Sequence, residues 1–367
     1  MSEYAKLYKK MRFSLLLLNL QIMSTRTILL GKNPEELKSV AVGLGLPPFT
    51  GKQLAKWLYV KKAGSFDDMT DISKAGRALL EANCEIGLCR PSDCQISTDG
   101  TKKYLFPVSC SDTSIEAVMI PDEDRKTLCV SSQAGCKMGC KFCMTGRQGF
   151  HGNLSVADIL SQFIAIDETE SLTNAVFMGM GEPLDNYDNV MKAIDALTSD
   201  WGFGWSPKRI TLSTIGVLPN LKRYLDECRC HLAVSLHNPF SEERAALMPA
   251  EKAYPIAEVV NLVKQYDFSG QRRVSFEYTM FAGVNDNKNH ADELKRMLEG
   301  LECRVNLIRF HKIPDFPYIS STQAIMESFR DRLNHQGITC TIRSSRGEDI
   351  LAACGMLAGR QNNNKDE

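Results

Sequence analysis

A repeated strand-then-helix pattern begins near Thr127 and constrains the fold more than any other feature of the chain. Short apolar runs typical of buried strands alternate with longer amphipathic segments, which indicates a parallel sheet covered by helices. We expect strands at 128–131, 175–178, 210–213, 232–236, 274–279 and 305–310, and helices such as 156–166, 189–197 and 256–265. Six such units are too few for a closed eight-stranded barrel. The sequence therefore predicts an α/β fold with an open, partial (βα)6 barrel.

The rest of the chain divides into smaller predicted parts. Alternating residues at 95–126 predict strands that link into the barrel at 127–359. Residues 27–94 predict a small helical accessory domain, with helix starts at Asn33, at a capping box of Thr50 and Gln53, and at Ser73. Residues 1–26 place basic residues before an apolar run that is too short to span a membrane, so we interpret them as an upstream-start extension. The polar tail 360–367 is predicted to be disordered.

Charge and cysteine content limit the class of protein. The formal net charge of the 367 residues is zero, so any nucleic-acid binding must come from a local basic face. Thirteen cysteines are scattered through apolar or helical context and do not form the pattern of a secreted disulfide framework. We expect a cytoplasmic protein with no membrane partner.

Three cysteines gather on one short loop. Cys136, Cys140 and Cys143 have the spacing Cys-x3-Cys-x2-Cys. A 4Fe-4S cluster normally takes four cysteines, so a triplet reserves one iron for an exchangeable ligand, which indicates catalysis. A structural zinc site with Cys129 as the fourth thiolate is the alternative reading of this loop.

Polar residues follow several of the predicted strands. Because the carboxyl ends of parallel strands meet at one edge of a sheet, these residues should surround one site. They are Gly181, Glu182, Ser213, Ser235, Leu236, His237 and His311. The glycines allow a close backbone approach to a ligand, and Glu182 can accept a hydrogen bond from an ammonium group.

Several short sequence segments resemble the RlmN/Cfr family of radical-SAM RNA methyltransferases. The segments that carry the resemblance are 127–136, 140–146, 179–184, 212–214, 235–237 and 346–355. The resemblance implies that Cys136, Cys140 and Cys143 hold one 4Fe-4S cluster. It also implies that S-adenosylmethionine, two molecules per turnover, contacts the strand-end residues named above. His311 stands where family members often carry an asparagine, so one cofactor hydrogen bond differs here.

The resemblance further implies three catalytic residues and the substrates. Cys354 would carry the methyl group as S-methylcysteine, Glu116 would act as general base, and Cys129 would form a transient disulfide with Cys354. Without the resemblance, the cysteines would be interpreted as small buried hydrophobes and Glu116 as a surface carboxylate. The implied products are C2-methylated adenine 2503 of 23S rRNA and adenine 37 of tRNAs; the alternative is a Cfr-like C8 methyltransferase of 23S rRNA.

RNA contacts and electron supply complete these expectations. The candidate phosphate contacts are Lys52, Lys56, Arg147, Gln148, Arg343 and Arg346. Each of these also fits an ordinary solvated charge. The partners implied by the resemblance are 23S rRNA, tRNA and a reductant such as flavodoxin or ferredoxin.

Overall fold

The computed structural model describes residues 26–270 and 272–359, and these fall into two compact units that divide between Gly87 and Leu88. The predicted extension and tail therefore lie outside the described residues, apart from Arg26. No helix within the described ranges is long and apolar enough to cross a membrane.

The first unit is a small helical domain closed by a two-stranded parallel sheet. Its elements are β1 (Thr27–Ile28), α2 (Pro34–Gly43), α3 (Thr50–Ala55), a π-helical turn (Lys56–Val60), α4 (Lys74–Asn83) and β2 (Cys84–Glu85). The predicted caps at Asn33 and Ser73 are confirmed, and each side chain accepts from backbone N–H groups of its first turn. The predicted capping box of Thr50 is wrong, because Phe49 is the N-cap residue and Thr50 already lies inside α3, where it is buried.

Surface lysines of this unit remain available to a partner. Lys52 and Lys56 are exposed, whereas Trp57 and Tyr59 are buried. Trp57 donates its indole N–H to Asp71 at 2.6 Å. The two aromatic rings are therefore core residues of this unit.

The second unit is built on one ten-stranded sheet. In chain order its strands are β3 (Asp93–Ile96), β4 (Lys102–Val108), β5 (Ser111–Asp122), β6 (Arg125–Cys129), β9 (Asn174–Phe177), β10 (Ile210–Thr214), β11 (His231–Ser235), β12 (Val274–Met280), β13 (Arg304–Arg309) and β14 (Thr339–Ile342). The order across the sheet is β14-β13-β12-β11-β10-β9-β6-β5-β4-β3, parallel from β14 to β6 and antiparallel from β6 to β3.

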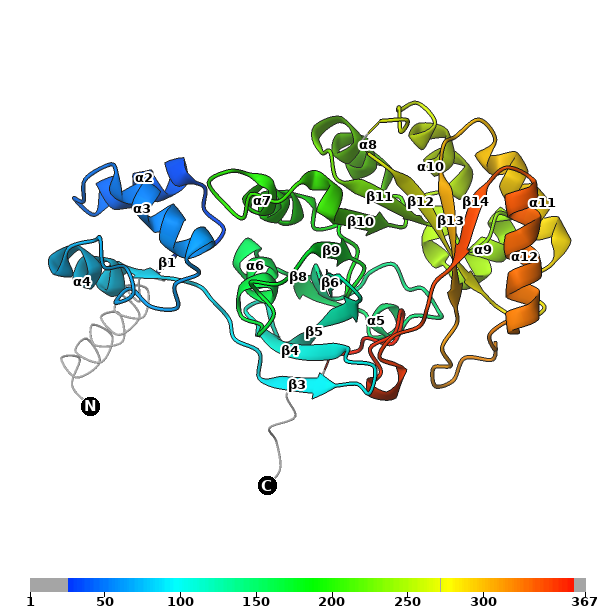
Figure 1. The fold of residues 1–367 in the computed structure, drawn as a ribbon, viewed down its shortest axis with the longest axis horizontal. Coiled ribbons are helices and arrows are strands. Elements are labelled where there is room, and N and C mark those ends of the chain that lie inside the picture. The colour runs from blue at the N-terminus through cyan, green and yellow to red at the C-terminus, as the bar shows by residue number, and fades with distance from the viewer. Residues whose placement is uncertain (1–25, 271, 360–367) are drawn as a thin grey trace, which may run out of the picture. The chain divides into compact units, whose positions relative to one another are not determined.

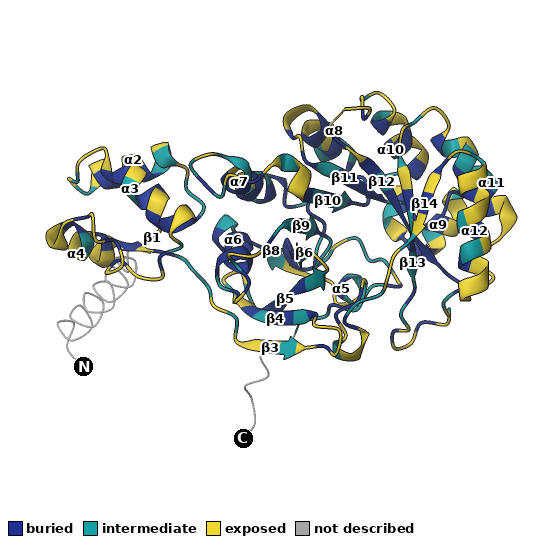
Figure 2. Ribbon diagram, in the orientation of Figure 1, coloured by how far each residue is buried: buried dark blue, intermediate teal, exposed yellow. Residues whose placement is uncertain are grey.

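Helices connect the parallel strands and cover the outer side of the sheet, as Figure 1 shows for α7, α8, α10, α11 and α12. They are α5 (Met144–Arg147), α6 (Val156–Ile164), α7 (Tyr187–Thr198), α8 (Leu218–Glu227), α9 (Ser241–Leu247), α10 (Ile256–Val263), α11 (Lys288–Leu298) and α12 (Gln323–His335). Figure 2 shows the sheet interior as buried and edge strand β3 as mostly exposed.

The six predicted barrel strands are all present, and the sheet also differs from the prediction in two ways. Residues 95–126 do not form a separate linker, because β3, β4 and β5 extend the same hydrogen-bonded sheet. A further parallel strand, β14, pairs with β13. Its sequence Thr-Cys-Thr-Ile is short and half polar, so it lacks the apolar run that marks the other barrel strands.

Candidate functional site

The three-cysteine loop lies between β7 (Gln133–Gly135) and α5. Backbone hydrogen bonds fix it at both ends: the Cys136 N–H donates to Gly149 O at 2.8 Å, and the Lys141 N–H donates to Leu247 O at 3.0 Å. Gly135 has φ +72°, and a Cβ there would lie 1.9 Å from Gly149 O. Only glycine therefore allows the loop to turn at this point.

Thiols and strand-end residues line one cavity, which we call the cysteine cavity. Among its lining residues are Cys136, Cys140, Cys143, Gly181, Glu182, Ser213, Ser235, His237 and Cys354. These come from the loop, from the carboxyl ends of the three neighbouring strands β9, β10 and β11, and from the C-terminal segment. The structure thus brings together most of the residues that the sequence pattern singled out.

The donor set of this cavity fits an iron–sulfur cluster. Burial raises the pKa of Cys136 to about 12 and the pKa of Cys140 further still, so thiolates here require a compensating cation. Within residues 26–270 and 272–359, no three Cys, His, Asp or Glu side chains converge as a single-ion site would require. A cubane cluster spreads its thiolates over separate irons, whereas zinc gathers them around one ion. Three thiols on one loop fit a cluster, which takes one thiolate on each of three irons.

The loop after β9 is shaped by its packing as much as by any ligand. Gly181 has φ +97°, and a Cβ would lie 2.5 Å from the Cβ of Gln133. The carboxylate of Glu182 accepts from the Leu184 N–H at 3.1 Å and from the Ile215 N–H at 3.0 Å. Burial raises the pKa of Glu182 to about 7. The Thr214 side chain adds a further hydrogen bond to this carboxylate. The two oxygens have about four lone pairs between them, so Glu182 can tie two loops together and still accept from an ammonium group.

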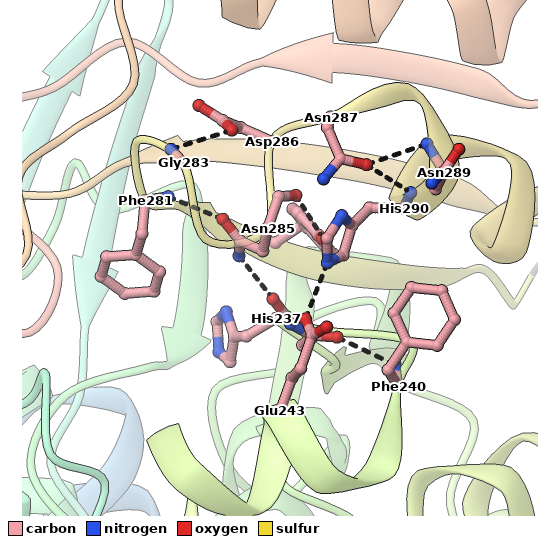
Figure 3. Close-up of polar contacts among 12 residues, drawn as sticks. His237, Phe240, Glu243, Phe281, Gly283, Asn285, Asp286, Asn287, Asn289 and His290 are labelled. Atoms are coloured by element: carbon pink, nitrogen blue, oxygen red, sulfur yellow. Dashed lines mark hydrogen bonds and ion pairs between the residues drawn. The ribbon is translucent and has the colours of Figure 1, made fainter.

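His237 follows β11 in a left-handed backbone conformation, with φ +57°. Its Nδ1 accepts from the Thr279 N–H at 3.0 Å, so the proton of the neutral ring is on Nε2 and can be donated to a ligand. The Asn285 amide donates to His237 O at 2.7 Å, as Figure 3 shows. It also donates to Thr279 O at 2.7 Å. Its Oδ1 accepts from the Phe281 N–H at 2.7 Å. The fully buried Asn285 thus fixes the position of the imidazole ring.

The imidazole of His237 should make acid destabilising. Burial and the nearby Arg244 lower its pKa from 6.5 to about 3. Because the folded-state pKa lies below the unfolded value, the contribution to stability is complete above pH 6.5 and is lost as pH falls toward 3. Asparagine tolerates this backbone conformation and keeps an acceptor for the Thr279 N–H. We expect His237→Asn to reduce the loss of unfolding free energy below pH 6.5 by about 1.4 kcal/mol per pH unit. Urea unfolding at pH 7, 6 and 5 measures this free energy.

The control for this prediction is the exposed His335 of α12. His335→Asn should leave the acid dependence of unfolding as in the wild type. Parallel pH profiles for the wild type and His237→Asn would contradict the assignment of a buried, neutral ring.

A buried arginine secures the end of β11. Arg244 is fully buried; its Nε donates to Leu236 O at 2.9 Å, one terminal nitrogen donates to Ser235 O at 2.8 Å, and the other forms an ion pair with Glu251. The Leu236 side chain is buried and is not among the described residues that line the cysteine cavity. Leu236 contributes to the site through its backbone carbonyl, which accepts from Arg244.

Cys354 also lines a second hollow, which we call the basic groove. Its charged lining residues are Arg125, Arg209, Arg309, Arg343, Arg346 and Asp122, with His311 beside them. Cys354 is exposed and lines both the cysteine cavity and this groove. The sulfur can therefore meet ligands on two sides.

Cys129 ends β6 close to Cys354. The thiol is 8% exposed, and burial raises its pKa to about 12. A charge on Cys354 raises that pKa and the Arg343 guanidinium lowers it, so both groups lie within electrostatic reach of Cys129. Arg343 in turn pairs with the buried Glu277 at 3.4 Å.

Glu116 and His311 lie apart from the cysteine cavity. Glu116, on β5, pairs with Lys103 at 3.2 Å and accepts from the Ala358 N–H at 3.0 Å, in a hollow on the other side of the C-terminal segment. The ring nitrogens of His311 face Ser345 Oγ at 3.1 Å and Glu348 at 3.4 Å. In this arrangement both residues contact the segment that carries Cys354.

Sequence reasoning missed Glu277, which is 3% exposed and lines the cysteine cavity. It accepts from Ser275 and Asn306 and pairs with Arg343. The sequence does mark this residue, because Glu277 is the one charged residue of strand β12, whose sequence is Val-Ser-Phe-Glu-Tyr-Thr-Met. A buried carboxylate in such a strand requires partners.

Comparison with known proteins identifies the family of this chain. Residues 130–294 match the family model of the Radical SAM superfamily, and residues 27–86 match the ribosomal RNA large subunit methyltransferase N-terminal domain. A crystal structure of a radical SAM methyltransferase from Sphaerobacter thermophilus is 37% identical, covers 90% of this chain and 99% of its own, and superposes with a TM-score of 0.85. The chain is thus a member of the radical SAM superfamily.

Curated relatives define the family more closely. The probable dual-specificity RNA methyltransferase RlmN of Porphyromonas gingivalis is 58% identical over 93% of this chain and 97% of its own length. The dual-specificity RNA methyltransferase RlmN of Syntrophus aciditrophicus is 41% identical over 89% and 94%. This chain belongs to the RlmN family.

Proposed function

We propose that this chain is a dual-specificity methyltransferase that methylates C2 of adenine 2503 in 23S rRNA and C2 of adenine 37 in tRNAs. The observation that best supports it is the exposed Cys354, which lines both the cysteine cavity and the basic groove. A thiol at that boundary can take up a methyl group on one side and present it to a nucleobase on the other. The curated relatives carry the name of an enzyme with two RNA specificities.

Cofactor binding is assigned to the residues of the cysteine cavity. Cys136, Cys140 and Cys143 would hold a 4Fe-4S cluster, and the strand-end residues Gly181, Glu182, Ser213, Ser235, Leu236 and His237 would hold S-adenosylmethionine. When bound, the two would supply a carbon radical able to remove hydrogen from a methyl group. We place His311 in the basic groove rather than against this cofactor, because both of its ring nitrogens face the C-terminal segment.

Radical chemistry suits the substrate. The C2 carbon of adenine is an electron-poor aromatic C–H without a lone pair, so ordinary displacement at a sulfonium has no nucleophile to use. In the proposed sequence, Cys354 accepts a methyl group from one S-adenosylmethionine and, after hydrogen removal at the expense of a second, its methylene radical bonds to C2. The adduct would then give up one electron to the cluster and one proton to a base, which restores the aromatic ring.

The remaining steps belong to side chains of this protein. Glu116 would take the proton from the substituted carbon; its carboxylate now accepts from the Ala358 N–H and pairs with Lys103. Cys129 would then attack the sulfur of Cys354 and release the methylated base. For Glu116 to reach the base, its bonds to the C-terminal segment must open.

The basic groove is the proposed path of the RNA. Its arginines can pair with phosphates while a base that has left its stack enters toward Cys354. The exposed Lys52 and Lys56 add positive charge on the first unit. We further propose that the enzyme works in the cytoplasm with a reductant such as flavodoxin or ferredoxin.

Mass spectrometry of nucleosides tests the reaction and the carbon together. Reconstituted protein would be incubated without oxygen with unmodified 23S rRNA or tRNA, reductant and S-adenosylmethionine. We expect new 2-methyladenosine in both RNAs. A product of 8-methyladenosine would assign the chain to C8 chemistry instead. Absence of either product, despite cleavage of S-adenosylmethionine, would contradict the proposed substrate.

A further inference from the structure

The four residues 346–349, Arg-Gly-Glu-Asp, lie shortly before Cys354, and of these only Arg346, in the basic groove, has been given a role so far. They belong to a segment with little regular structure, in which only the turn Glu348–Ile350 is helical. A segment of this kind moves readily unless it is anchored. Its anchors therefore decide where the sulfur of Cys354 lies.

Asp349 contacts the turn between β3 and β4. Its Oδ1 accepts from Ser97 Oγ at 2.5 Å, and its Oδ2 accepts from the Thr98 N–H at 3.0 Å. These hydrogen bonds hold the pKa of Asp349 below its usual value. The carboxylate is thus bound in its charged form, which makes both bonds stronger than neutral ones.

Asp99 makes the reciprocal contact from the same turn. One carboxylate oxygen accepts from the Gly347 N–H at 2.9 Å, and the other accepts from the Thr101 N–H at 2.9 Å. Gly347 has φ +63°, and a Cβ there would lie 2.8 Å from the Cβ of Ala352. Each of the two segments thus supplies an aspartate that accepts from a backbone N–H of the other segment.

The other two charged residues of 346–349, Arg346 and Glu348, have partners outside the β3–β4 turn. Arg346 faces Asp122 at 3.5 Å, and Glu348 faces His311 at 3.4 Å. Beyond Cys354, the Met144 N–H donates to Gly355 O at 2.8 Å, which ties the segment to the start of α5 and hence to the cysteine loop. Cys354 is therefore held from both sides.

We propose that Asp99 and Asp349 form a clasp that positions Cys354 between the cysteine cavity and the basic groove and within reach of Cys129. They are positioning residues, since neither lines the cysteine cavity or the basic groove. The inference rests on the proposed function, because it presumes that Cys354 must meet Cys129. It also gives the β3–β4 turn a role in catalysis.

Backbone strain in the segment supports a clasp. Leu351 has φ +54°, although it is neither glycine nor asparagine, and its side chain is 57% exposed. Such a conformation persists only where surrounding contacts over-determine it. Asp349, two residues before Leu351, is anchored through its carboxylate to Ser97 and Thr98, and Lys103 Nζ approaches Leu351 O at 3.5 Å.

The test is the disulfide equilibrium of Cys129 and Cys354, which needs neither RNA nor methyl transfer. Cluster-loaded, full-length protein would be equilibrated without oxygen in glutathione buffers of graded ratio and quenched with acid, and the Cys129–Cys354 peptide would be quantified by mass spectrometry. Loss of the clasp lowers the effective concentration of one thiol near the other. We expect Asp349→Ala to lower the equilibrium constant on the order of tenfold, the value of hydrogen bonds to a charged group.

Three further variants separate positioning from general damage. Asp349→Asn keeps an acceptor for Thr98 and a partner for Ser97, so it should restore most of the wild-type constant. Asp99→Ala should resemble Asp349→Ala, whereas the exposed Asp112→Ala on β5 should have no effect. Thermal unfolding of each variant reports on the fold.

Two results would overturn the inference. An unchanged disulfide constant in both Asp349→Ala and Asp99→Ala would show that the clasp does not position Cys354. A wild type that forms no Cys129–Cys354 disulfide at any glutathione ratio would contradict the thiol pairing of the proposed function itself, and with it the clasp. Normal disulfide behaviour without RNA methylation would contradict the proposed substrate and leave the clasp supported.

Discussion

Replacement of Cys354 by alanine is expected to abolish RNA methylation while the protein still binds its cluster. The thiol is the proposed carrier of the methyl group, and no other cysteine of the described chain lines both the cysteine cavity and the basic groove. Loss of a residue that forms a covalent intermediate reduces turnover on the order of a thousandfold or more. The measurement combines iron and sulfide content of the purified protein with mass spectrometry of nucleosides from treated RNA.

The fold should survive this change, because Cys354 is exposed and its neighbours hold the segment through backbone groups. Cys110→Ala, which removes another exposed cysteine, is the matched control and should retain methylation. Methylation by Cys354→Ala at the wild-type rate would refute a cysteine-carried methyl group. Loss of the cluster in the same variant would show that Cys354 has a role in assembly that the geometry does not explain.

Most of the barrel could be predicted because its strands are short, mainly apolar runs that alternate with amphipathic helices. All six expected strands occur, with ends shifted by a few residues at most. Strand β14 was not predicted, because its sequence Thr-Cys-Thr-Ile is short and half polar and lacks the apolar run of the other barrel strands. The cap at Thr50 was predicted wrongly because Thr-x-x-Gln has the capping-box pattern, whereas the helix already begins through backbone bonds at Pro47 and Phe49.

The site could be predicted where residues follow strand ends, and less well where tertiary contacts decide. Cys136, Glu182 and His237 share a cavity because parallel strands end at one edge. The partners of Glu116 and His311 depend on a long-range fold of the C-terminal segment, which local pattern does not encode. The family resemblance supplied their roles, which remain predictions.

The two reactive cysteines differ in their surroundings. Cys354 lies at the boundary of two hollows, whereas Cys129 is buried at the end of β6. Burial raises the pKa of both thiols, and it raises that of Cys129 to about 12. A thiol of that kind is a poor first nucleophile, but it can react once a partner sulfur is brought against it and a positive group such as Arg343 favours its thiolate. Cys129 therefore suits the last step of the sequence.

Replacement of Cys129 by alanine is accordingly expected to trap the RNA on the protein. In the last step an S–S bond forms between Cys129 and Cys354, the C–S bond to the base breaks, and the released carbon takes up a proton to become the methyl group. Without Cys129 the C–S bond has no attacking sulfur, so nearly every turnover should end as a covalent protein–RNA adduct. Denaturing gels with labelled RNA, followed by nuclease digestion and mass spectrometry of the Cys354 peptide, measure it.

The buried Cys340 of β14, 3% exposed, provides the matched control, and Cys340→Ala should release product normally. The double variant with both Cys129 and Cys354 replaced by alanine should form no adduct, because the carrier sulfur is gone. Free methylated adenosine from Cys129→Ala at the wild-type rate would contradict release through a disulfide. An adduct that persists in the double variant would place the covalent bond on another residue and so contradict the role given to Cys354.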